Sequence, residues 1–177
     1  MSVTDTRDTY GTLIEPTTLQ IQRVLPGPIQ RVWAYLTQSE LRRQWLASGD
    51  MPMAVGSEFE LVWRNDELTN PPGNRPEGFE DDHRMTAVIT ELDPPRRLAY
   101  TWGDTGGVAF ELESRGDQVL LTLTHHRIAE RTTRLYVSAG WHMHLDVLTA
   151  RLSGSEPEPF WDGWLKLKDE YDERLPQ

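Results

Sequence analysis

The sequence predicts an α+β fold in which a long helix packs across one face of an antiparallel sheet. Between residues 56 and 126, apolar and polar residues alternate in short runs separated by tight turns, a pattern typical of an antiparallel meander. A helix over residues 139–152 follows and carries an apolar stripe on each of two sides. Because a surface helix has a single apolar side, this helix must lie between the sheet and a second covering element.

The first elements expected along the chain are a tail, a strand and two short helices. Residues 1–16 are polar and lack periodicity, so we expect a flexible tail. Residues 18–25 alternate and predict a half-buried strand, which Pro26-Gly27-Pro28 ends. Apolar residues recur with helical spacing over residues 29–36. A second short helix is expected over residues 41–46, with Ser39 as its N-cap.

At least five strands are expected to form the meander. Phe59, Leu61 and Trp63 share one face of the first of these strands. Residues 65–84 are acidic and rich in Pro and Gly, which predicts a long, mobile connection of a kind that is often functional. The later strands cover residues 85–92, 98–102, 108–112 and 119–125. Residues 127–138 are then expected to connect the sheet to the long helix.

The long helix presents its two stripes at regular helical spacing. One stripe is Trp141, Leu145, Leu148 and Leu152, and the other is Ala139, Met143, Val147 and Ala150. Gly154 suits the left-handed residue that ends a helix. Residues 160–171 predict a further amphipathic helix. We expect either this last helix or a second subunit to cover the second stripe.

Composition excludes several classes of function. The chain has no Cys, so disulfides, thiolate metal sites and a Cys nucleophile are excluded. Its formal charge of −10 opposes binding to nucleic acid or to anionic lipid surfaces. No apolar run reaches the length of a membrane span and no signal peptide is recognisable, so we expect a cytoplasmic protein. The seven Trp residues are the compositional outlier and suit both cores and ligand pockets.

Six short segments follow one another along the chain: Arg23 with Pro28-Ile29-Gln30-Arg31-Val32-Trp33, residues 41–45, Gly56-Ser57-Glu58-Phe59, residues 93–102, residues 121–125 and Gly140-Trp141. In this order they resemble the START-like (SRPBCC) superfamily of helix-grip folds. The likeness is greatest to the group named after the activator of heat-shock protein 90 ATPase. The resemblance implies a Bet v-like helix-grip domain over residues 17–153, in which a curved antiparallel sheet wraps around the long helix and encloses an apolar cavity. Residues 154–177 extend past the usual end of that domain as a helix that packs on the domain or on a partner.

The candidate ligand-binding residues are the inward-facing residues of the strands together with the facing stripe of the long helix. They are Phe59, Leu61, Trp63, Tyr100, Trp102, Phe110, Leu121, Leu123, Trp141, His144, Leu145 and Leu148. A filled core would use the same residues, because burying each large side chain contributes about 1.5–3 kcal/mol. Ordinary core packing is therefore the alternative to an open cavity. His144, at the edge of the stripe, is the best polar candidate inside a pocket.

The titratable residues form no recognisable catalytic or metal motif. His125 and His126 are adjacent on a strand and point to opposite faces, while His142 and His144 diverge around the helix, so neither pair converges on one ion. We expect no metal, no cofactor and no catalytic residue. Arg23 lies among inward-facing residues and needs a carboxylate partner. Glu60 and Glu111 are the candidates for that partner.

Three functions remain open. The first is non-enzymatic binding of an apolar or aromatic small molecule, lipid or polyketide-like, between the sheet and the long helix. The second is a protein-interaction module related to chaperone ATPase activators, which the resemblance suggests, with the net charge of −10 and the acidic segment as its interaction surface. The third is a cyclase-like or hydrolase-like enzyme that uses polar pocket residues, and the resemblance supplies no shared catalytic motif for it. A homodimer formed through the last helix is a further expectation, because exposed aromatic residues mark interfaces.

Overall fold

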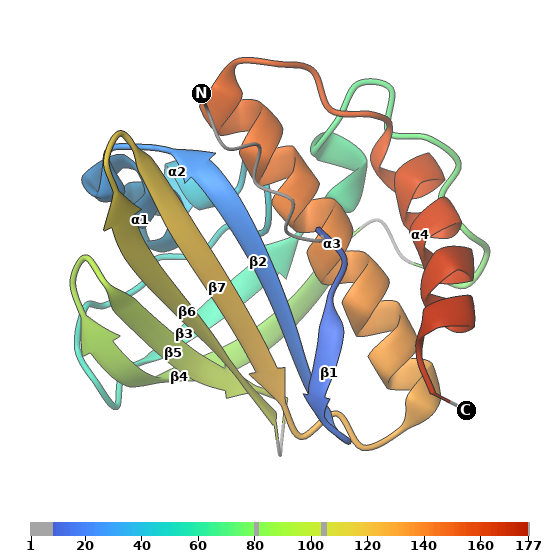
Figure 1. Ribbon diagram of the computed structural model, residues 1–177, viewed down its shortest axis with the longest axis horizontal. Coiled ribbons are helices and arrows are strands. Elements are labelled where there is room, and N and C mark those ends of the chain that lie inside the picture. The colour runs from blue at the N-terminus through green and yellow to red at the C-terminus, as the bar shows by residue number, and fades with distance from the viewer. Residues whose placement is uncertain (1–8, 80–81, 104–105, 177) are drawn as a thin grey trace.

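The computed structural model describes residues 9–79, 82–103 and 106–176 and has the predicted α+β fold, with a curved antiparallel sheet around a long helix (Figure 1). The strands are β1 (Thr12–Glu15), β2 (Thr18–Pro26), β3 (Glu58–Trp63), β4 (His83–Asp93), β5 (Arg97–Trp102), β6 (Gly106–Arg115) and β7 (Gln118–His126). The helices are α1 (Ile29–Thr37), α2 (Ser39–Arg42), the 3-10 helix η1 (Asn65–Glu67), α3 (Arg131–Ser153) and α4 (Phe160–Arg174).

The sheet has the strand order β1-β2-β7-β6-β5-β4-β3, so β3 to β7 form the predicted meander. Strand β2 extends the sheet beyond the meander by pairing with β7, with Arg23 opposite Leu121. Along β7, Leu121 and Leu123 are fully buried, whereas the two threonines that alternate with them are only partly buried. This alternation turns one face of the sheet toward α3 and the other face toward solvent.

Helices α1 and α2 lie between β2 and β3 and are joined by the buried side chain of Arg42. Its guanidinium donates hydrogen bonds to four backbone carbonyl oxygens between residues 36 and 49. The prediction of Ser39 as an N-cap is wrong, because Ser39 is the first residue of α2 and its Oγ accepts a hydrogen bond from the N–H of Gly49 (2.9 Å). The short helix ends at Arg42, where the side chain of Arg42 turns inward to those carbonyls.

Helix α3 is buried on both of its predicted apolar sides. On one side, the ring of Trp141 packs against Trp102 and Phe110 of the sheet, with centroid distances of 5.2 and 5.7 Å. On the other side, α4 lies along α3 and away from the sheet (Figure 1). The two helices approach so closely that a Cβ added at Gly163 would lie 2.5 Å from Met143 Sδ. The last helix therefore covers the second stripe, and Gly154 ends α3 in the left-handed conformation with a φ of 72°.

Three boundaries differ from those predicted. Helix α2 covers Ser39–Arg42 rather than residues 41–46. Helix α3 begins at Arg131 rather than near residue 139, because the Arg131 guanidinium holds its first turn against the end of α4, with Nη1 at 2.8 Å from Asp172 Oδ1. Residues 12–15, predicted to belong to a flexible tail, instead form β1 and pair with β2. Backbone pairing creates this strand without an alternating side-chain pattern. Residues 1–8 of the predicted tail lie outside the described residues.

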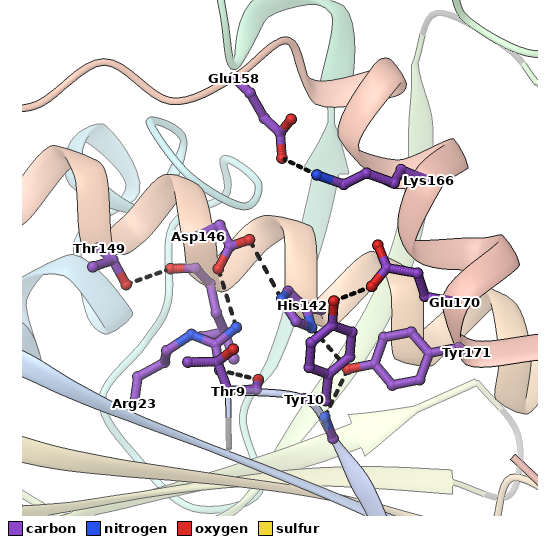
Figure 2. Close-up of polar contacts among 12 residues, drawn as sticks. Thr9, Tyr10, Arg23, His142, Asp146, Thr149, Glu158, Lys166, Glu170 and Tyr171 are labelled. Atoms are coloured by element: carbon purple, nitrogen blue, oxygen red, sulfur yellow. Dashed lines mark hydrogen bonds and ion pairs between the residues drawn. The ribbon is translucent and has the colours of Figure 1, made fainter. Parts of the chain in front are cut away.

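A polar cluster beside α3 joins β2, α3, α4 and the segment that precedes β1 (Figure 2). Arg23 of β2 donates a hydrogen bond to Asp146 Oδ1 of α3 (3.1 Å) and another to a backbone carbonyl of the N-terminal segment. His142 Nδ1 lies 2.8 Å from the hydroxyl oxygen of Tyr171 on α4. The same hydroxyl accepts a hydrogen bond from the backbone N–H of Gly11 (2.6 Å). The cluster thus ties both ends of the described chain to the middle of α3.

The predicted partners of Arg23 are wrong, because its carboxylate partner is Asp146. Glu60 and Glu111 point to the exposed face of the sheet, where each pairs with a different arginine at 3.1 and 2.5 Å. Arg23 points the opposite way and is 5% exposed. Burial raises the pKa of Asp146, and the Arg23 guanidinium opposes that increase.

The structure also places the histidines that the sequence analysis considered as possible metal ligands. His125 is buried and His126 is exposed, as expected for neighbours on a strand. His142 Nε2 lies 3.5 Å from Asp146 Oδ2, within the polar cluster. In the described ranges, no three His, Asp or Glu side chains are grouped closely enough to hold a metal ion. No helix within the same ranges is long and apolar enough to cross a membrane.

Candidate ligand-binding cavity

A cavity of about 430 Å³ lies where the sheet, α3, α4 and the segment between β3 and β4 meet. The sheet and α3 contribute Trp63, His83, Trp102, Tyr136, Val137, Gly140, Trp141 and His144. The rest of the wall comes from other parts of the chain: Leu46, Asn65, Gly78, Phe79, Asp82, Phe160, Trp161 and Trp164. Most of these side chains are aromatic or apolar, which is the usual composition of a site for small organic molecules.

The aromatic side chains of the wall form two connected groups. On the side of the sheet and α3, Trp102 packs against Trp63 (5.4 Å between centroids) and against Trp141 (5.2 Å). On the side of α4, Phe79 stacks on Trp161 with an interplanar angle of 13° and a centroid distance of 5.6 Å. Phe79 also contacts the edge of Trp164 (5.2 Å). These ring contacts fix the large side chains, so the cavity is bounded by surfaces that are already ordered.

The segment after β3 is fastened to the start of α4. The backbone N–H of Phe160 donates to Thr69 Oγ1 (2.9 Å), and the indole N–H of Trp161 donates to Asp66 Oδ1 (2.7 Å). Asp162 Oδ1 accepts a hydrogen bond from the N–H of Asn74 (3.0 Å). The sequence predicted a mobile connection over residues 65–84, but the first half of this segment is held by these contacts. The first of these bonds also satisfies the backbone N–H of Phe160, which has no partner within α4.

His144 places a neutral imidazole in the wall. The side chain is 7% exposed, and Nδ1 lies 2.8 Å from the carbonyl oxygen of Trp45. Because a carbonyl oxygen only accepts, Nδ1 carries the proton and Nε2 is left as an acceptor. Burial lowers the pKa of His144 to about 4, so the ring is uncharged at neutral pH. No described residue hydrogen-bonds Nε2.

A second acceptor in the wall belongs to Asn65. Its Oδ1 is buried and has no hydrogen-bond partner. In the described part of the chain, only one other side-chain oxygen shares that state, and it belongs to Ser138, which does not line the cavity. A buried acceptor without a partner costs about 1–3 kcal/mol, so such atoms are rare in folded proteins. Asp82 is the only described lining residue with a formal charge at neutral pH.

Four of the twelve candidate residues line this cavity: Trp63, Trp102, Trp141 and His144. The other eight do not line it and are at most 5% exposed within the core: Phe59, Leu61, Tyr100, Phe110, Leu121, Leu123, Leu145 and Leu148. At these eight positions the side chains pack as part of the core, because the long helix and the sheet are in direct contact there. The open space lies instead at one edge of the interface between the helix and the sheet.

Sequence reasoning missed the part of the wall that α4 and the connecting segment supply. Phe79 is the only aromatic residue in residues 65–84, and an isolated aromatic in a polar segment was a usable signal. The sequence predicts that the helix carrying Phe160, Trp161 and Trp164 covers α3 or packs on a partner. They also reach the cavity because α4 lies against both α3 and η1.

Comparison with known proteins identifies the family. Residues 26–153 match the family described as activator of Hsp90 ATPase homolog 1-like protein. The protein encoded by gene BPP1335 of Bordetella parapertussis is 37% identical, with a TM-score of 0.80 over 96% of this chain and 92% of that one.

More distant structures share the fold. CalU16 of Micromonospora echinospora is 21% identical, with a TM-score of 0.65 over 88% of this chain and 86% of that one. The conserved protein of unknown function EF2215 of Enterococcus faecalis is 22% identical, with a TM-score of 0.67 over 93% of this chain and 88% of that one. No curated protein matches the sequence. The match to most of the chain shows that it belongs to the family of activator of Hsp90 ATPase homolog 1-like proteins, within the START-like (SRPBCC) group that its segments resemble.

Proposed function

We propose that this protein binds an apolar or aromatic small molecule, without transforming it, in the cavity between β3, β5, α3 and α4. The observation that carries the proposal is the cavity itself, whose volume of about 430 Å³ falls in the range of about 300–1,000 Å³ typical of small-molecule sites. Its wall is aromatic on two sides and holds few polar groups. Such a wall favours burial of apolar ligand surface over recognition of charge.

Lipid-like and polyketide-like ligands remain the two chemical classes proposed, and the protein is proposed to act in the cytoplasm. The tryptophans supply a direct measurement, since Trp63, Trp102, Trp141, Trp161 and Trp164 all line the cavity. Titration with long-chain alcohols, fatty acids and polycyclic aromatic compounds is expected to change intrinsic fluorescence for at least one class. The same ligand should raise the thermal midpoint, because it binds the folded state alone.

Gly140 is a suitable position for a cavity-filling substitution. It lines the cavity on α3, and a Cβ added there would meet only Trp164 Nε1, at 3.9 Å. Gly140→Leu is therefore expected to fold, to occupy the ligand's space and to weaken binding at least tenfold. Gly140→Ala is the matched control, since it makes the same backbone change with little added volume and should retain binding. Equal ligand affinity in both variants and the wild type would place the ligand outside this cavity.

A further inference from the structure

The acceptors of the wall restrict the kind of ligand that the cavity can hold. We propose that the ligand is an uncharged aromatic compound that donates a hydroxyl hydrogen bond to His144 Nε2, and that carboxylates are excluded. This inference rests on the proposed function and names its ligand class.

The acceptor on His144 is fixed by its other nitrogen. The bond from Nδ1–H to the Trp45 carbonyl leaves the lone pair of Nε2 unused. Fully buried side-chain atoms without a partner in the described chain are Asn65 Oδ1 and Ser138 Oγ alone. Nε2 is not among them, so it is reached from the cavity that His144 lines. A ligand hydroxyl is the simplest group that donates to an imidazole nitrogen in an otherwise aromatic wall.

The charge of the wall excludes anions. No Lys or Arg is found among the described residues of the wall, and its single formal charge is the carboxylate of Asp82. A group of three arginines, Arg43, Arg64 and Arg151, lines a separate small pocket that shares only Leu46 with the cavity. Moving a carboxylate into an apolar site without a cationic partner is strongly unfavourable. The net charge of −10 adds to the repulsion.

Three probes of one shape test the inference by calorimetric titration: 2-naphthol, 2-methylnaphthalene and 2-naphthoate. The hydroxyl and methyl groups are nearly the same size, so their comparison isolates the hydrogen bond. We expect 2-naphthol to bind about threefold to tenfold more tightly than 2-methylnaphthalene and 2-naphthoate to bind most weakly. Equal affinity of the first two probes, or tightest binding of 2-naphthoate, would overturn the inference while leaving the proposed function in place. If none of the three binds but a long-chain alcohol or fatty acid does, the inference fails and the proposed function stands; if no probe of either class binds, the proposed function itself is contradicted.

A variant of His144 assigns the preference to its nitrogen. His144→Asn keeps an N–H group for the Trp45 carbonyl and removes the acceptor at Nε2. It should abolish the preference for 2-naphthol and leave affinity for 2-methylnaphthalene within twofold. His126→Asn, the same change on the exposed face of the sheet, should keep the full preference. A preference for 2-naphthol that is unchanged in His144→Asn would refute the assignment.

Discussion

At the scale of single residues, buried polar side chains are held mainly by backbone groups. Arg42 is 1% exposed and donates to four carbonyl oxygens, and the imidazole of His144 donates to one. His125 Nδ1 accepts the indole N–H of Trp141 (2.9 Å). Such bonds add little net stability when intact and cost much when one partner is removed. Sequence patterns did not reveal them, because a polar residue inside a core shows its partner only in three dimensions.

Arg42→Leu is predicted to destabilise the fold by about 3 kcal/mol, because it leaves buried carbonyl oxygens without donors. Urea unfolding followed by circular dichroism measures the change. Arg43→Leu is the control, since the neighbouring guanidinium is largely exposed and pairs only with Glu40. The control should change stability by less than about 0.5 kcal/mol. Similar losses in the two variants would show that the buried bonds of Arg42 contribute nothing specific.

Stability is predicted to decrease as the pH falls from about 6.5 toward 4. Burial lowers the pKa of His144 to about 4 and that of His125 to about 3. In this window the unfolded chain binds protons at both histidines and the folded chain does not, so acid favours unfolding, by up to about 1.4 kcal/mol per pH unit for each histidine. Urea midpoints between pH 7 and 4.5 should therefore depend less on pH in His144→Asn. A pH dependence as steep in His144→Asn as in the wild type would contradict this prediction.

At the scale of elements, the spacing of apolar residues predicted the features that depend on the local side-chain pattern. The meander, the two-sided helix α3 and the ending of α3 at Gly154 follow from alternation, helical spacing and a left-handed cap. The start of α3 and strand β1 could not be predicted, because they depend on Arg131 reaching α4 and on backbone pairing with β2. The same limit applies to the cavity. Alternation shows which face of a strand is buried, but not whether an opposing side chain fills the space in front of it.

Two glycines in the packed helices are predicted to respond in opposite directions to alanine. Gly140→Ala on α3 should raise stability by about 0.5–1 kcal/mol, because its Cβ meets nothing closer than 3.9 Å and alanine is the better helix former. Gly163→Ala on α4 should lower stability by about 1 kcal/mol, since its Cβ would lie 2.5 Å from Met143 Sδ and 3.0 Å from Glu158 Oε1. Thermal unfolding of both variants tests the packing of α3 against α4. A gain in both would mean that the helices are more loosely packed.

At the scale of the whole molecule, the cavity depends on parts of the chain that lie outside or between the elements of the helix-grip core. The family match ends at residue 153, where α3 ends, whereas α4 supplies Phe160, Trp161 and Trp164 to the wall. The segment after β3 supplies Phe79 and is fastened to α4. The core of the fold therefore supports a wall that two peripheral segments complete.

Weakening that contact is predicted to speed ligand exchange without disturbing the sheet. Thr69→Val keeps the side-chain shape but leaves the buried N–H of Phe160 without its acceptor, which should cost about 1–3 kcal/mol locally. Amide hydrogen exchange should rise over residues 65–79 and the first turn of α4, and the dissociation rate of a cavity ligand should rise severalfold. Thr122→Val removes a side-chain hydrogen bond to Gln22 between β2 and β7 and serves as the control. If both variants leave the dissociation rate unchanged, the ligand enters by another route, because, of the two substituted residues, Thr69 alone lies between the two segments on this side of the cavity.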